Sequence, residues 1–179
     1  MYIHNFFKFQ AFALLFATIT SPQSALADTN SYQRTINFTL GTNEVIGTNV
    51  ECAPSFIGGD ITGVGTGSIT ANGNRRSLGV LTVTADDCIT PELSDPSHFM
   101  SDGDLTLSFR NGDTINAHYS AFFIPTDYSA QYYKYKDFAI EVTGGTGRFT
   151  GVSGSGTLKG VSDITSGVGV VKGIMHIYK

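Results

Sequence analysis

The stretch LTLSFRNGDTINAHY, residues 105–119, predicts two β-strands joined by a tight turn. Apolar and polar side chains alternate on both sides of its centre, which is typical of a strand with one buried face. Asn111-Gly112-Asp113 lies at that centre, and Asn-Gly favours the positive φ angles that short hairpin turns require. The segment therefore predicts a β-hairpin.

The rest of the chain after residue 27 is also predicted to consist of β-strands and turns. Short runs rich in Thr, Val, Ile, Phe and Tyr are separated by Gly, Asn, Asp and Ser, and no window has helical periodicity. Long loops are expected at 86–102 and at 125–134, where alternation is lost. Strands are expected at 32–40, 45–51, 60–71, 77–85, 104–110, 114–124, 136–143, 152–163 and 168–178.

Glycines recur at alternate positions inside two of these strands. Gly63, Gly65 and Gly67 fall on one face of a single strand, and Gly154 and Gly156 do the same later in the chain. Glycine within a strand marks a bend or a close approach of backbone. Several such strands favour a small closed barrel, which also removes the exposed edges of an open sheet.

The first 27 residues are predicted to be a secretory signal peptide. The apolar run 9–19 is too short to span a bilayer, and Ala25-Leu26-Ala27 supplies the small residues that a signal peptidase requires. An uncleaved anchor is the alternative. With cleavage, residues 28–179 form a single β-barrel domain that is secreted or periplasmic.

The two cysteines, Cys52 and Cys88, are predicted to form a disulfide, because an isolated pair in an oxidising compartment usually does so. A metal or redox role is the alternative. It is disfavoured since the sequence has no CxxC motif and no His at ligand spacing. No metal site is predicted.

The charge of the chain is mildly acidic and dispersed. Eleven Lys and Arg against fifteen Asp and Glu give a net charge of −4 without a basic cluster. Because phosphate contacts need concentrated basic side chains, no nucleic acid partner is expected.

The segment Gly144-Gly145-Thr146-Gly147-Arg148-Phe149 resembles the GGTGRF signature of the allene oxide cyclase-like and dirigent-like β-barrel family, most of all its small secreted bacterial members. Three stretches support the match in the same order, namely 63–67, 77–79 and 111–113, so that the resemblance covers about residues 36–177. It implies an all-β, calycin-like, eight-stranded antiparallel β-barrel with a central cavity. It also implies no metal or organic cofactor, because plant relatives steer a reactive lipid epoxide or a phenoxy radical pair by shape. Gly144, Gly145, Gly147, Arg148 and Phe149 are interpreted as a structural turn.

No catalytic residue can be named from the sequence. Gly145-Thr146-Gly147 has the wrong spacing for a dinucleotide-binding loop, and Ser155 lies in a strand pattern rather than on a nucleophile elbow. Strand parity groups residues without telling which group faces inward. Arg110, His118 and Glu141 are chosen as candidates to line the cavity, with a surface position as the alternative for Glu141.

Three functions remain open. The first is binding of a small apolar or aromatic molecule in the cavity, in keeping with 13 Phe and 8 Tyr. The second is a cofactor-independent cyclase or isomerase, or a dirigent-type protein that steers a reactive substrate. The third is a structural or adhesive surface protein. A homo-oligomer is compatible with each of them.

Overall fold

A computed structural model describes residues 33–179, so the predicted signal peptide lies outside the described residues. Within residues 33–179 the chain is almost entirely β. One short 3₁₀ helix, η1 (Gly147–Phe149), interrupts the strands. The strands are β1 (Arg34–Thr48), β2 (Ile57–Ala71), β3 (Asn74–Pro91), β4 (Phe99–Phe109), β5 (Thr114–Thr126), β6 (Ser129–Gly145), β7 (Ser153–Asp163) and β8 (Val168–Tyr178).

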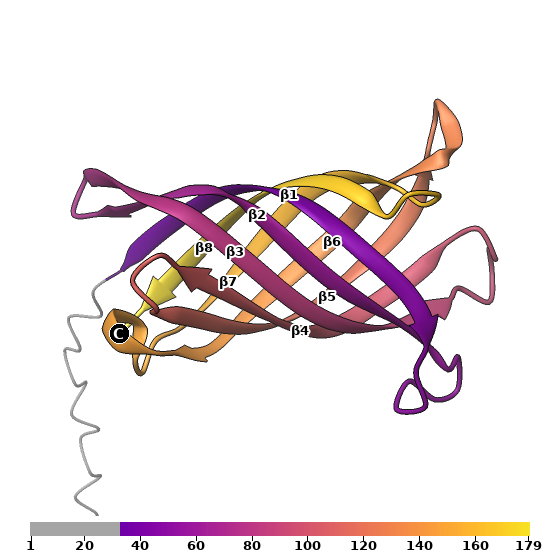
Figure 1. Ribbon diagram of the computed structural model, residues 1–179, viewed down its shortest axis with the longest axis horizontal. Helices are drawn as coiled ribbons and strands as arrows, with labels where there is room; N and C mark the ends of the chain where they lie inside the picture. Colours follow the sequence, from indigo (N-terminus) through magenta and orange to yellow (C-terminus); the bar gives the residue numbers. More distant parts are fainter. Residues whose placement is uncertain (1–32) are drawn as a thin grey trace, which may run out of the picture. The chain divides into compact units, whose positions relative to one another are not determined.

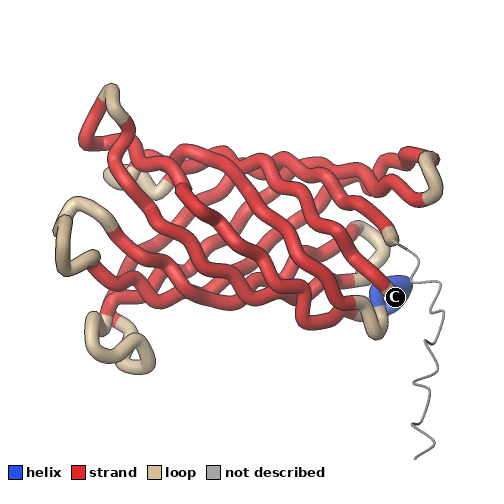
Figure 2. Tube along the Cα trace, turned by 180° about the vertical axis from the view of Figure 1, so that it is seen from behind, coloured by secondary structure: helices blue, strands red, loops and turns tan. Residues whose placement is uncertain are grey.

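The eight strands form a closed barrel in which each strand pairs antiparallel with the next (Figure 1). β8 pairs with β1 and closes the ring, so that every described strand has a neighbouring strand on both sides (Figure 2). The predicted eight-stranded antiparallel β-barrel is confirmed. The hairpin predicted at residues 111–113 is also confirmed, with Gly112 at φ 86° in the β4–β5 turn.

The structure corrects three predicted boundaries. Two predicted strands are parts of one strand, β1, which includes residues 34–40 of the first run and 45–48 of the second, while 49–51 belong to the following loop. β2 and β8 pair with β1 through the intervening residues, so the ladder overrides weak local propensity. The predicted loop 86–102 is mostly strand, and only 92–98 connects β3 to β4. The predicted irregular stretch 125–134 is mostly strand, and only residues 127–128 form the turn between β5 and β6. Pro125 is accommodated at a register shift near the end of β5.

One end of the barrel is filled by the GGTGRF segment. Phe149 is fully buried and stacks on Phe109 with ring centroids 4.6 Å apart. The Arg148 guanidinium lies over both rings and pairs with Asp113 at 3.1 Å. Gly147 has a left-handed backbone at φ 57°, and a side chain there would overlap the Asp113 carboxylate. The segment is therefore a turn that plugs this end of the barrel.

The alternating glycines of β2 face the interior. A β-carbon at Gly67 would lie 2.6 Å from the Leu81 side chain, and one at Gly63 would lie 2.8 Å from Val83. On β8, the ring of Phe38 occupies the place that a side chain at Gly173 would take. Glycine thus leaves the volume that the large side chains of neighbouring strands fill.

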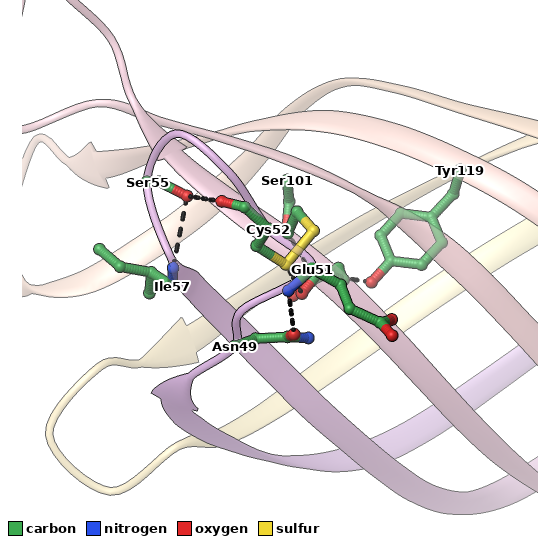
Figure 3. The surroundings of a disulfide bond; sticks show 9 residues. Asn49, Glu51, Cys52, Ser55, Ile57, Ser101 and Tyr119 are labelled. Atoms are coloured by element: carbon green, nitrogen blue, oxygen red, sulfur yellow. Dashed lines mark hydrogen bonds between the residues drawn. A yellow bond between two sulfur atoms is a disulfide. The ribbon is translucent and has the colours of Figure 1, made fainter.

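The predicted disulfide between Cys52 and Cys88 is confirmed, with Cα atoms 5.1 Å apart. It ties the β1–β2 loop, residues 49–56, to β3 (Figure 3). The loop is further held by hydrogen bonds from the Phe56 amide and the Ser55 hydroxyl to the Cys52 carbonyl. Among residues 33–179, no helix is long and apolar enough to cross a membrane.

The inner glycines give a direct test of this packing. A methyl group at Gly65 would overlap the Thr39 carbonyl oxygen, whereas one at Gly47 would meet nothing within 4 Å. We expect Gly65→Ala to lower the free energy of unfolding by about 2 kcal/mol or more. Gly47→Ala should change it by less than about 0.5 kcal/mol. Urea denaturation of the two variants measures both, and equal midpoints would contradict the assignment of Gly65 to a crowded inner face.

Candidate functional site

The barrel encloses a cavity of about 60 Å³ with a mostly apolar wall. A volume of this size holds a few water molecules or a small organic group. Asp87 is the one carboxylate among the described residues that line it. The apolar wall includes Phe38, Leu40, Leu107, Phe138, Ile140 and Met175.

Asp87, on β3, is buried, with 4% of its surface exposed. Its Oδ2 atom accepts hydrogen bonds from the Ser101 hydroxyl on β4 and from the Tyr119 hydroxyl on β5, the latter at 2.8 Å. Its Oδ1 atom accepts no hydrogen bond of good geometry from the described residues, although the nearby backbone amide of Gly59 lowers the pKa of the carboxyl group. Figure 3 shows Ser101 and Tyr119 beside the disulfide. Asp87 is thus a buried carboxyl group with one satisfied and one free oxygen.

The strand register brings these three side chains together. Asp87 lies opposite Gly103 on β4, and Gly103 lies opposite Tyr119 on β5. A β-carbon at Gly103 would lie 2.6 Å from that of Asp87, so only glycine leaves room for the carboxyl group. Since Ser101 is two residues before Gly103, it points to the same face.

Glu44, on β1, is the second carboxyl group at this place. A β-carbon at Gly59 would lie 2.7 Å from Asp87 Oδ1 and 2.8 Å from Glu44 Oε1. The two oxygens are therefore at most about 5.5 Å apart, the sum of these distances. Burial, followed by the nearby charge of Asp87, raises the pKa of Glu44 to about 7. Burial likewise raises the pKa of Asp87, although its bonds from Ser101 and Tyr119 oppose this shift.

An aromatic cluster borders the carboxyl pair. The Tyr119 ring stacks on Phe138 at 5.2 Å, and Tyr135 meets Phe138 edge to face at 5.5 Å. Burial raises the pKa of both tyrosines, so they remain neutral hydrogen-bond donors at physiological pH. The site therefore offers an apolar wall, neutral hydroxyl groups and a pair of carboxyl groups that can share a proton.

The three residues predicted to line the cavity lie elsewhere. Arg110 is exposed in the β4–β5 turn, and Glu141 is exposed on the outer face of β6. His118 is on the outer face of β5, with its ring nitrogens 3.1 Å from Asp104 and 3.4 Å from Asp102. The hydrogen bond to Asp104 raises the pKa of His118. The inward faces belong to the apolar alternates of these strands, Phe109, Tyr119 and Ile140.

Sequence reasoning missed Asp87, Glu44 and Ser101. Asp87 was assigned to a loop because two prolines follow and alternation stops there. The available signal was the continuation of Leu81, Val83 and Ala85 by two further residues, which places Asp87 on the buried face. No group of three or more His, Cys, Asp or Glu within residues 33–179 is arranged to hold a metal ion.

The described residues thus define a closed, eight-stranded, up-and-down β-barrel with an apolar interior and a carboxyl pair made of buried Asp87 and partly buried Glu44. Among solved structures, the fold of this chain is similar to the structure of a pterocarpan synthase dirigent protein. The identity is 14%, the match covers 92% of this chain and 98% of the other, and the TM-score is 0.45. No protein-family model and no curated protein matches the sequence.

The raised pKa of Glu44 predicts a pH-dependent stability. Between pH 4.5 and 7 an unfolded chain has lost this proton while the folded chain keeps it, so stability falls as the pH rises through this window. Glu44 contributes at most about 3 kcal/mol to the fall. Urea titrations from pH 4.5 to 8 should give a shallower slope for Glu44→Gln and an unchanged slope for Glu141→Gln, its exposed control. Equal slopes in both variants would contradict the burial of Glu44.

Removal of one hydrogen bond to Asp87 tests its environment. We expect Tyr119→Phe to cost about 1–3 kcal/mol of unfolding free energy, because a buried carboxyl group then keeps only Ser101 as a donor. Tyr132→Phe, at a half-exposed tyrosine, should cost less than about 0.5 kcal/mol. Calorimetry of the two variants compares them, and a loss of equal size would argue against a bond specific to Tyr119.

Proposed function

We propose that the protein binds a small apolar or aromatic molecule in the barrel cavity and orients it through the Asp87 cluster. The observation that carries the proposal is Asp87, the one carboxyl group among the described residues that line the otherwise apolar cavity, whose Oδ1 atom is buried without a hydrogen-bond partner. A buried polar atom without a partner costs free energy, and a ligand hydroxyl would supply the missing donor. Neither the ring stack at Tyr119 nor the apolar wall satisfies that atom, and protonated Glu44, at most about 5.5 Å away, is the carboxyl group that would compete with a ligand for it.

Location outside the cytoplasm belongs to the same proposal. The Cys52–Cys88 disulfide supports it, since such bonds persist in oxidising compartments. The signal-like segment 1–27 and the GGTGRF resemblance are consistent with a secreted or periplasmic protein of the dirigent-like type. The adhesive alternative loses support because β8 pairs with β1 and closes the ring, so that no strand position is vacant for a donated strand.

Binding is tested with phenol and benzene, which differ by one hydroxyl group. We expect phenol to bind about tenfold more tightly, because its hydroxyl donates to Asp87. Ala85→Ile fills the cavity and should abolish binding, whereas Thr84→Ile on the outer face should not. Ligand-observed NMR measures the affinities, and native mass spectrometry of the protein from its own host identifies the natural occupant. Equal affinities, or binding that survives Ala85→Ile, would refute the proposal.

A second candidate is cofactor-independent isomerisation or cyclisation by proton transfer. The specific observation is the pKa of Glu44, about 7, beside a second buried carboxyl group. A carboxyl group with a pKa near the working pH can act as a general base in its ionised form and then return the proton as an acid. Glu44 would take the proton, and Asp87 with Tyr119 would hold the polar group of the substrate.

This candidate predicts deuterium exchange at the carbon next to the carbonyl of 2-cyclohexenone, used as a probe in D₂O. The protein-dependent rate should rise as the pH passes through about 7, because Glu44 must be ionised to act as a base. Glu44→Gln should abolish the added rate without preventing phenol binding, and Glu141→Gln should leave it intact. Binding without exchange in the wild-type protein would leave the binding proposal standing and exclude this one.

A further inference from the structure

One end of the barrel exposes large apolar side chains on every connection. The four connections there, 49–56, 92–98, 127–128 and 164–167, lie at the right in Figure 1 and at the left in Figure 2. Each has at least one apolar tip residue open to solvent. Their exposed fractions range from 43% to 103%, and the residues, which we call the apolar rim, are Val50, Phe56, Leu93, Tyr128 and Ile164.

The other end of the barrel differs. The β2–β3 turn is Asn72-Gly73, and residues 110–113 of the β4–β5 turn are Arg, Asn, Gly and Asp. The apolar residues of the β6–β7 connection, Phe149 and Val152, are buried. Exposed apolar loop tips therefore concentrate at the end opposite the plug. A single exposed apolar residue is normal on a protein surface and indicates no function. Exposed apolar residues on all four connections at one end, however, indicate an interaction surface.

The charges of the rim restrict its partner. The same connections carry Glu51, Glu92, Asp95 and Asp127, and contain no Lys or Arg. Such an end is repelled by an anionic surface, since peripheral binding to acidic lipids relies on basic side chains. An apolar, acidic end fits an uncharged surface.

The rim residues lie on four different connections rather than on one strand or one loop. A fluid lipid interface accommodates separate projecting side chains, whereas a folded partner must match them in shape. The rim is also connected with the candidate site, because Ile164 lines the same depression of about 290 Å³ as Glu44 and Phe123. Lipid contact at the rim would place an apolar molecule close to the carboxyl pair.

We propose that the apolar rim docks the barrel end-on to an uncharged, zwitterionic phospholipid surface. The side chains at the loop tips enter the interface, and the acidic residues beside them remain in water. The polar end of the barrel, with the GGTGRF plug, faces away from the lipid. Docking is peripheral and reversible, and it does not depend on which molecule the cavity binds.

The absence of Trp from the chain allows a site-specific probe. Tyr128→Trp places the only indole at the rim, and Tyr178→Trp places it near the opposite end as a matched control. With phosphatidylcholine vesicles, we expect a blue shift of the Tyr128→Trp emission and none for Tyr178→Trp. Equal shifts, or no shift in either variant, would overturn the end-on orientation.

The contribution of the rim is measured by vesicle flotation of two double variants. Leu93→Ser with Tyr128→Ser should weaken partitioning by about tenfold or more, because two fully exposed apolar tips are lost. Val64→Ser with Val80→Ser, exposed on the barrel wall, should leave it unchanged. All variants share residues 1–32, so any lipid contact from that segment cancels in the comparison. Circular dichroism establishes that each variant is folded.

Three results would overturn the proposal. The first is an equal loss of partitioning in the rim and wall variants. The second is tighter binding to vesicles with phosphatidylglycerol than to phosphatidylcholine alone, which contradicts the charge argument. The third is a concentration-dependent dimer, dissolved by the rim substitutions, in a protein that ignores vesicles, since the rim would then be a contact between two copies.

Discussion

The interior volume of a closed eight-stranded barrel limits every other feature of this molecule. The strands close in a ring, so a large inward side chain on one strand requires a small residue on its neighbours. Phe38 on β1 occupies space that Gly173 leaves on β8, and Leu81 on β3 occupies space that Gly67 leaves on β2. The same exchange operates at the candidate site, where Gly59 and Gly103 provide the space that the carboxyl groups of Glu44 and Asp87 occupy. Packing and chemistry here have one origin, the placement of glycine on the inner face.

The two ends of the barrel differ in the groups that they bury. At one end, the stacked rings of Phe109 and Phe149 close the interior under the Arg148 guanidinium. At the other end, the carboxyl pair, the tyrosines and the disulfide gather near the loops. Polar groups in an apolar interior are tolerated when hydrogen bonds satisfy them. Among the described residues, the one buried side-chain oxygen left without a partner belongs to Asp87, close to the loop that the disulfide ties down.

The sequence predicts the architecture better than the site. Alternation at residues 105–119, the glycines at 63–67 and the GGTGRF segment lead to the closed barrel and its plug, because these signals are local. The inward face depends on which alternate residues are covered by distant strands, and this is decided by closure. His118 and Tyr119 are neighbours on β5, and a shift of one residue separates an exposed ion-paired histidine from a buried tyrosine. Asp87 was not predicted because the loop was expected to begin at residue 86, whereas the alternation of Leu81, Val83 and Ala85 continues to Asp87.

Asp87 and Cys88 are adjacent residues of β3, and a strand turns adjacent side chains to opposite faces. The covalent bond to Cys52 therefore anchors, from the outer side, the same backbone unit that presents the buried carboxylate on the inner side. The hydrogen bonds from the Phe56 amide and the Ser55 hydroxyl to the Cys52 carbonyl are internal to the β1–β2 loop, so the disulfide is its covalent link to β3. Oxidation of the two cysteines therefore adds a covalent brace directly behind the carboxylate, and a reduced chain would hold the same backbone unit through the β-ladder alone.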